Sequence, residues 1–415
     1  MAVVLIGTLD TKGPEYSWLR ERLVELGSEV IVVDAGIGRE STGPSSDFGA
    51  PAAASVEDIS NVRVAAAGGA DLSALRAAGD RGAAVAAMGE GAAVVLAELH
   101  DEGQVDGVLA VGGSGGSSIA ARAVRDLPIG LPKLIVSTMA SGDVSPYVGA
   151  KDVTIMYSVV DIAGINRVSR LILGNAAAAI AGMAAAYAAT QTATQHDDRP
   201  LVAASMFGVT TPAVDAARER LTEHGYEVLV FHATGAGGRA MEGLADSGLL
   251  AGVLDLTTTE LADDLVGGVL SAGPDRLTAA GRQGVPQVVA PGALDMVNFG
   301  PADSVPPRFE GREFYVHNPT VTLMRTTPEE MAELGRRVAA KLAAATGPTA
   351  LFVPLRGVSA LDAPGMPFHD QKADDACFEA LAAYPGAIQL DLHINDPAFG
   401  RALADRLHDL IRGEG

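Results

Sequence analysis

The feature of this sequence that most constrains its fold is an internal repeat. Residues 20–30 (RERLVELGSEV) and 218–228 (RERLTEHGYEV) align without a gap, and eight of the eleven positions are identical. In both copies a helical segment ends, a glycine follows it, and an apolar strand begins. A single repeat of this size indicates two related halves of the chain.

The order of elements around each copy is strand, loop, helix and strand. In the first half we predict strands at 3–6 and 29–33 around a helix at 15–26. In the second half, Thr211 and Pro212 are the expected N-cap and first residue of a helix that ends near 224. Strands that alternate with helices, and that lack alternation of apolar and polar residues, are typical of parallel sheets covered on both faces.

We therefore predict an α/β protein of two Rossmann-like, doubly wound domains with mostly parallel sheets, related by the internal repeat. The expected domains are 1–195 and 196–415, and the polar stretch at 192–200 lies between them. Two such domains usually hold a ligand in the cleft between them, at the carboxyl ends of the strands.

Composition excludes several classes of function. The chain of 415 residues has a formal net charge of −21 and no run of Lys or Arg, so binding to nucleic acid or to anionic membranes is not expected. A single cysteine, Cys377, cannot form an intramolecular disulfide. The first residues lack the basic region of a signal peptide, and the Ala-rich segment 171–190 is interpreted as a buried helix. We expect a cytoplasmic protein.

A glycine-rich segment in the first half predicts an anion site. Residues 112–118 (GGSGGSS) stand between a strand and a helix, where glycine lets the backbone approach a ligand and the helix N-terminus favours phosphate or carboxylate. The segment is neither a P-loop nor a dinucleotide fingerprint, and a purely structural turn remains the alternative. Other strand-end loops should lie nearby, with Lys12 as a point charge and Asp34 placed to bind a ribose hydroxyl. The candidate nucleotide-binding residues are Gly7, Thr8, Asp10, Lys12, Asp34, Gly112, Gly113, Ser114, Gly115, Gly116, Ser117, Ser137, Thr138 and Ser141.

The second half carries polar loops instead of the glycine segment. Thr257, Thr258 and Thr259 stand at the equivalent place, and the long loop 354–370 is of a kind that is more often functional than not. Histidines there are candidates for proton transfer near neutral pH, and arginines for pairing with a substrate carboxylate. The candidate catalytic residues are Asp295, Asn298, His317, Arg325, Arg356, Asp362 and His369.

Two other chemistries are disfavoured in this half. A metal site built from His369, Asp370 and His393 lacks the usual ligand spacing, so we predict no metal-binding residues. Cys377 lies in an acidic helix, which would raise the pKa of its thiol, so it is not a candidate nucleophile.

A family resemblance is carried by the strand-end loops 7–13 and 112–118 and by segments 161–167, 295–299, 317–326 and 357–370. Over essentially its whole length, the chain resembles the UPF0261 family. These proteins are described as carrying a Tm-1-like ATP-binding domain. The resemblance implies two α/β domains, a homodimer, and an ATP site in the N-terminal domain, carried here onto residues 7–12, 112–118 and 137–141. A plant member joins this module to a separate TIM barrel and binds a viral replication protein. The present chain ends at Gly415 without that barrel, so the antiviral role is not expected.

The leading hypothesis is an ATP-binding enzyme that acts on a small, anionic organic substrate, by ATP-dependent activation or by hydrolase or lyase chemistry. Whether Mg²⁺ accompanies the nucleotide is left open. One alternative is a non-catalytic module in which the bound nucleotide controls binding to a partner. A second alternative, motivated by Asp34, is an NAD(P)-dependent oxidoreductase.

Overall fold

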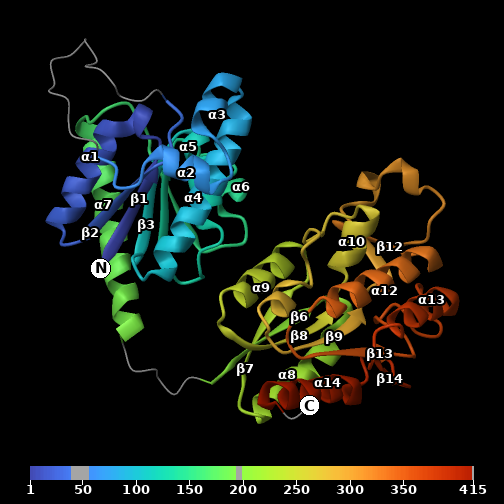
Figure 1. Ribbon diagram of the computed structural model, residues 1–415. Helices are drawn as coiled ribbons and strands as arrows, with labels where there is room; N and C mark the ends of the chain where they lie inside the picture. Colours follow the sequence, from blue (N-terminus) through green and yellow to red (C-terminus); the bar gives the residue numbers. More distant parts are fainter. Residues whose placement is uncertain (39–55, 193–198, 414–415) are drawn as a thin grey trace, which may run out of the picture. The chain divides into compact units, whose positions relative to one another are not determined.

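The computed structural model describes residues 1–38, 56–192 and 199–413. The chain divides into two compact units, Met1–Gln195 and His196–Gly415. Each unit contains its own parallel sheet with helices on both faces (Figure 1). The predicted fold class, two doubly wound α/β domains with mostly parallel sheets, is confirmed.

The N-terminal unit is built on a five-stranded parallel sheet in the order β2-β1-β3-β4-β5. This order is that of flavodoxin-like folds, in which the chain reverses direction across the sheet between the first and third strands. The strands are β1 (Ala2–Gly7), β2 (Glu29–Asp34), β3 (Gly107–Gly112), β4 (Lys133–Ser137) and β5 (Val153–Tyr157), and the helices are α1 (Leu9–Glu25), α2 (Asn61–Ala67), α3 (Leu72–Ala78), α4 (Arg81–Asp101), α5 (Ser114–Val124), α6 (Ser145–Val148) and α7 (Arg167–Thr192).

Alternate side chains of the central strands pack against different helices. Val3 and Leu5 of β1 face α1 and α7, whereas Val4 and Ile6 face the layer formed by α2, α4 and α5. Because both faces are covered, the strand residues are apolar throughout, as the sequence predicts.

The C-terminal unit contains a six-stranded parallel sheet in the order β14-β13-β9-β8-β6-β7. When the strands of this sheet are numbered in chain order, the first five follow the same 2-1-3-4-5 order as those of the N-terminal sheet. The strands are β6 (Leu201–Met206), β7 (Glu227–His232), β8 (Leu250–Thr257), β9 (Gln287–Gly292), β13 (Thr349–Pro354) and β14 (Ile388–Leu390), and the helices are α8 (Thr211–Glu223), α9 (Ala236–Asp246), α10 (Glu260–Val266), α11 (Ala279–Arg282), α12 (Pro328–Ala343), α13 (Gln371–Leu381) and α14 (Pro397–Arg412).

Helices α8 and α14 pack on one face of this sheet, and α10, α12 and α13 pack on the other. A second, antiparallel sheet is inserted after β9, in the order β10-β12-β11. Its strands are β10 (Met296–Phe299), β11 (Phe314–Asn318) and β12 (Val321–Arg325). Short 3₁₀ turns occur at η1 (Gly208–Thr210), η2 (Ala302–Ser304) and η3 (Pro307–Phe309).

The sequence repeat has the same structure in both units. Helices α1 and α8 end at Glu25 and Glu223, and Gly27 and Gly225 follow with φ values of +84° and +92°. Glycine adopts this left-handed conformation without the steric cost that a Cβ brings.

The predicted helix starts need correction. Helix α1 begins at Leu9 rather than at 15, with a kink at Lys12 before Pro14. Thr211 is the first residue of α8, and the N-cap is Thr210.

Two helices, Arg81–Asp101 and Arg167–Gln191, are long and apolar enough to cross a membrane by length and composition. Half of the apolar window in the first of them is buried within the protein, and α7 packs Leu173, Ala176 and Ile180 into the core beneath β3. Both helices cover the sheet with one face. In α7 only 33% of the apolar window is buried, which is less than the buried helix that the sequence predicts.

Candidate functional sites

The N-terminal unit has a cavity of about 720 Å³ at the carboxyl ends of its strands. The loop after β1 and the loop after β3 both line it, so it lies where the strand order reverses, the usual ligand position in such sheets. Its volume falls in the range of small-molecule sites, roughly 300–1,000 Å³. Its lining includes Thr8, Asp10, Lys12, Gly113, Ser114, Gly115 and Gly116 from the predicted nucleotide-binding set, and Thr11, Gly38, Arg76, Asp80, Arg81 and Asp161 beyond it.

The glycine segment forms the start of α5 rather than a long loop. Only Gly113 lies between β3 and the helix, because Ser114 is already its first residue. No side chain of the described residues caps this end of the helix. The first-turn N–H groups have no partner within the helix, and residues Ser114, Gly115 and Gly116, which carry them, line the cavity.

An arginine lies beside this helix start. A Cβ built on Gly115 would come 3.5 Å from Nη2 of Arg81, so the guanidinium lies close to the first turn of α5. Arg81 makes no hydrogen bond or ion pair with another described residue. By contrast, Arg76 donates to the carbonyl oxygens of Ile37 and Gly38, and Lys12 donates to the carbonyl oxygen of Ile162.

Several predicted nucleotide-binding residues have structural contacts instead. A Cβ on Gly7 would overlap the hydroxyl of Tyr16, which donates to the carbonyl oxygen of Ile6 and accepts from Val111 N–H. Asp34 is buried, accepts from the N–H groups of Leu9 and Gly36, and has its pKa raised to about 6 by burial.

The other residues of this unit that the sequence predicts to bind nucleotide do not line the cavity. The hydroxyls of Ser117 and Ser137 are hydrogen-bonded to each other at 2.6 Å in the buried space between α5 and β4. Gly112 allows α5 to pack closely on β3, because its Cβ would lie 2.9 Å from the Cα of Gly116. Thr138 and Ser141 follow β4 outside the lining residues.

In the C-terminal unit, charged side chains gather at the carboxyl ends of β9 and β13. Asp295 follows β9, Asp362 follows β13, and Arg325 ends β12. Arg325 Nη2 donates to Asp374 Oδ1 of α13 at 2.8 Å and lies 3.8 Å from Asp362 Oδ1. Ser359 Oγ donates to Asp295 Oδ2 at 2.7 Å. We call Asp295, Arg325, Ser359, Asp362 and Asp374 the Arg325 cluster.

The Arg325 cluster is buried but not fully hydrogen-bonded. Its members are 0–4% exposed, yet Asp295 Oδ1, Asp362 Oδ1 and Arg325 Nε have no hydrogen-bond partner among the described residues. Burial raises the pKa values of Asp295, Asp362 and Asp374, while the positive charge of Arg325 opposes the increase. Unpaired buried polar atoms cost about 1–3 kcal/mol each, so their presence needs an explanation.

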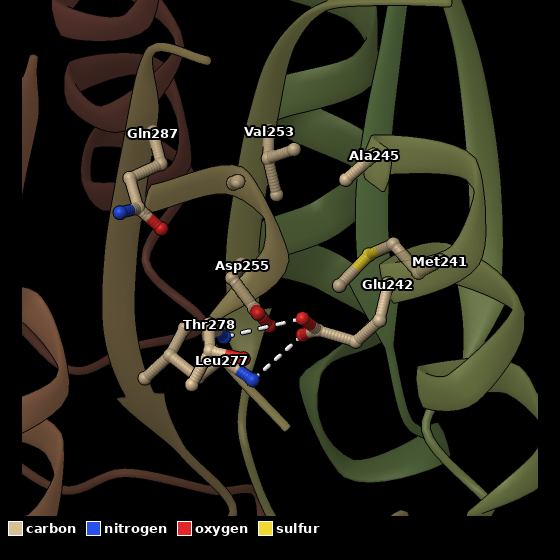
Figure 2. Close-up of a pocket in the computed structure, with 9 residues that line it drawn as sticks. Met241, Glu242, Ala245, Val253, Asp255, Leu277, Thr278 and Gln287 are labelled. Atoms are coloured by element: carbon tan, nitrogen blue, oxygen red, sulfur yellow. Dashed lines mark hydrogen bonds between the residues drawn. The ribbon is translucent and has the colours of Figure 1, made fainter. Parts of the chain in front are cut away.

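A second buried cluster in the same unit is the natural comparison. Arg276 binds Asp255 through two nitrogens and also donates to Glu260 and Glu242. Glu260 accepts from the N–H groups of Gly235 and Gly238. Glu242 accepts from the N–H groups of Leu277 and Thr278, as Figure 2 shows, and from that of Ala279.

This Arg276 cluster is interpreted as structural. The side-chain polar atoms of Arg276, Asp255, Glu260 and Glu242 are absent from the unpaired buried atoms of the described residues. The cavity beside them, drawn in Figure 2, measures only about 10 Å³, room for one water molecule.

The structure places the other predicted catalytic residues in different surroundings. His369 lies at the edge of the Arg325 cluster, with Nδ1 3.8 Å from Asp362 Oδ1 and its side chain 33% exposed. Asn298 donates instead to Asp263 Oδ2 of α10 at 2.6 Å. Arg356 forms an exposed ion pair with Asp391.

His317 and Arg325, both candidate catalytic residues, do not lie together. Arg325 N–H donates to the carbonyl oxygen of Glu313, four residues before His317 in the hairpin. At ~3.3 Å per residue, His317 is therefore about 13 Å farther along the hairpin, and it is exposed.

Thr257, Thr258 and Thr259 have local structural roles, and so do Asp370 and His393 of the metal set that the sequence disfavours. Thr257, Thr258 and Thr259 are buried, with their hydroxyls bonded inside the protein. Asn395 N–H donates to His393 Nδ1, so the proton is on Nε2, which donates to backbone carbonyl oxygens. Asp370 caps α13.

Sequence reasoning missed Asp374, Ser359 and Arg81. Asp374 stands in the acidic stretch that starts α13, where its neighbour Asp375 is exposed, and only the amphipathic period of the helix distinguishes the two. Ser359 was within the long loop but was not singled out. Arg81 follows Asp80, the N-cap of α4, far in sequence from any strand end.

The fold and these sites define a class of protein: two doubly wound α/β units, one with a large cavity at its strand ends and one with a buried Asp–Arg cluster at the equivalent edge of its sheet. Residues 1–189 match the family model described as "Uncharacterised protein family (UPF0261) N-terminal domain", and residues 199–411 match the model of its C-terminal domain. The chain belongs to the UPF0261 family.

Relatives match over nearly the whole chain. A UPF0261 protein of Clostridium tetani is 48% identical over 99% of this chain and 98% of its own length, and one from Rhizobium meliloti is 48% identical over 98% of both. The ToMV resistance protein Tm-1(GCR237) of Solanum lycopersicum is 41% identical over 97% of this chain but 55% of its own length. Among solved structures, the Streptomyces glycosyltransferase SsfS6 matches 98% of this chain and 99% of its own at 13% identity, and its TM-score of 0.18 is too low to inform the fold.

Proposed function

We propose that this protein is an ATP-binding enzyme whose N-terminal unit holds the nucleotide. The observation that carries the proposal is the Arg81 guanidinium, which has no hydrogen-bond or ion-pair partner among the described residues. It lies beside the first turn of α5, which no described side chain caps, at the edge of a cavity of about 720 Å³. A helix N-terminus and a guanidinium both favour phosphate oxygens. Lys12 and Arg76 add two further positive charges to the lining, which also contains Asp10, Asp80 and Asp161.

The rest of the cavity supports a nucleotide better than a bare anion. Ile37, Leu75, Val85 and Ile119 give one part of it an apolar lining, which suits a flat base. Asp34 is buried and outside the lining, so the contact that motivated an NAD(P)-dependent oxidoreductase is without support.

The Arg325 cluster supports an enzymatic role for the C-terminal unit. His369, which is one-third exposed, lies 3.8 Å from Asp362 Oδ1, and the two side chains are placed to exchange protons with a small substrate. Asp295 Oδ1 and Asp362 Oδ1, which accept no hydrogen bond from a donor group of the described residues, are acceptors that a substrate would satisfy. The alternative is a module without chemistry, in which the nucleotide controls binding to a partner.

The test is isothermal titration of the full chain with ATP, with and without Mg²⁺. We expect Arg81→Ala to weaken binding about tenfold, since a hydrogen bond to a charged group contributes about 1.5–3 kcal/mol. Gly115→Val should abolish binding, because its methyl groups would fill the space between α5 and Arg81. Matched controls are Arg125→Ala, at the other end of α5, and Gly182→Val in α7. A Cβ on Gly182 would meet no other atom within 4 Å among the described residues.

Lack of binding at millimolar ATP, or equal loss in the control variants, would refute the nucleotide proposal. A phosphate-release assay then separates an ATP-consuming enzyme from a nucleotide-controlled module. Sedimentation equilibrium tests the homodimer, which we also propose on the strength of the family resemblance.

A further inference from the structure

The Arg325 cluster and His369 together contain a set of atoms with the spacing of a metal site. One carboxylate oxygen each from Asp362 and Asp374 and one ring nitrogen of His369 all lie within 4.8 Å of one another. Asp362 and His369 come from the segment between β13 and α13, and Asp374 comes from the first turn of α13. This set differs from the His369, Asp370 and His393 combination that the sequence disfavours.

Both carboxylates are held in place by the protein. Asp362 Oδ2 accepts from Val358 N–H at 2.8 Å. Its Oδ1 is buried, and among the described residues the only donor it can meet is the Asp374 carboxyl group in its protonated form. Asp374 Oδ1 accepts from Arg325 at 2.8 Å. Metal-binding carboxylates are commonly oriented in this way by hydrogen bonds from an outer shell.

The charges of the cluster are unbalanced. Asp295, Asp362 and Asp374 bring three negative charges when ionised, and Arg325 brings one positive charge. The excess corresponds to the charge of one divalent cation. The Arg276 cluster has the same ratio of carboxylates to arginine, but there backbone N–H groups bind Glu242 and Glu260.

We propose that Asp362, His369 and Asp374 bind one divalent transition-metal cation of the Mn²⁺, Fe²⁺ or Zn²⁺ type. Two carboxylates with an imidazole favour these ions over Mg²⁺ or Ca²⁺, which prefer oxygen ligands alone. His369 is one-third exposed, so the cation would keep open positions on that side for water or substrate. Bound there, it would lower the pKa of a water molecule or polarise a substrate oxygen. The site is independent of the nucleotide proposal.

The experiment uses the full chain, stripped with EDTA and titrated with Mn²⁺, with the free ion followed by electron paramagnetic resonance. One Mn²⁺ per chain is expected, and Zn²⁺ should compete for it. Asp374→Asn keeps an acceptor for Arg325 but removes the charge, and His369→Ala removes the nitrogen ligand. Each should weaken binding by about tenfold or more, since even outer-shell substitutions cost 10–100-fold. The control is Asp375→Asn, the exposed neighbour on α13, which should bind as the unsubstituted protein does.

Absence of Mn²⁺ and Zn²⁺ binding at millimolar concentration would overturn the proposal. Unchanged affinity in His369→Ala would overturn it equally. Because His369 is partly exposed, that variant should fold even if Asp374→Asn does not, and circular dichroism checks both. Loss of affinity in Asp375→Asn to the same extent would indicate diffuse binding to the acidic surface and would also refute the site.

Discussion

We expect the protonation of Asp263 in α10 to make the free energy of unfolding depend on pH. Its side chain is 1% exposed and accepts from Asn298 Nδ2 at 2.6 Å, from Asn298 N–H and from Leu270 N–H. Burial nevertheless raises its pKa from 3.8 to about 7. The folded protein therefore binds this proton more tightly than the unfolded chain does. The resulting stability is fully present below pH ~4 and is lost as the pH rises through about 7.

Asp263→Asn should remove this pH dependence. The variant lacks the buried charge, and after rotation of the Asn298 amide its new N–H can donate to Asn298 Oδ1. This oxygen has no hydrogen-bond partner among the described residues of the unsubstituted protein. Relative to the unsubstituted protein, its free energy of unfolding should increase between pH 4 and 8 by up to about 4 kcal/mol, at ~1.4 kcal/mol per pKa unit. Urea unfolding at several pH values measures this, with the exposed Asp303→Asn as control. A difference that stays constant with pH would contradict the assignment.

At the scale of elements, the repeated helix ends make a paired prediction. Gly27 and Gly225 both have positive φ and nothing near their missing Cβ, so Gly27→Ala and Gly225→Ala act on backbone conformation alone. Each should destabilise the protein by about 1–2 kcal/mol, the cost of a left-handed L-residue. Gly182→Ala, inside α7, should instead stabilise it by about 0.5–1 kcal/mol. Thermal unfolding of the three variants measures the sign of each change in stability. Stabilisation by Gly27→Ala or Gly225→Ala would contradict the role of these left-handed glycines at the helix ends.

The elements could be predicted because their signals are local. Apolar runs predicted the parallel strands, such as those at 3–6 and 29–33 that correspond to β1 and β2. The composition of the Arg325 cluster was only partly predictable. Asp295 and Asp362 lie in loops that follow strands, and Arg325 ends β12, so all three were candidates. Asp374 reaches the cluster because the packing of α13 turns one of two adjacent aspartates inward. Such a choice depends on tertiary contacts that no short sequence window contains.

At the scale of the molecule, the two units have separate hydrophobic cores. The clusters around Val4 and around Leu5 contain residues of the N-terminal unit alone, and those around Val289 and Val202 contain residues of the C-terminal unit alone. Each unit is the size of an ordinary domain and completes its own sheet. The information for folding should therefore lie within each half.

We expect fragments 1–195 and 196–415 to fold when produced separately. Each should show a single cooperative urea transition with a free energy of unfolding of about 5–15 kcal/mol, the usual range for a domain. If the proposed sites are correct, fragment 1–195 should bind ATP and fragment 196–415 should bind Mn²⁺, each with the affinity of the full chain. Circular dichroism and the two binding assays test this. A fragment that remains unfolded while the full chain folds would show that its stability depends on the other unit. Two folded fragments that bind neither ligand, when the full chain binds both, would instead show that the sites need both units.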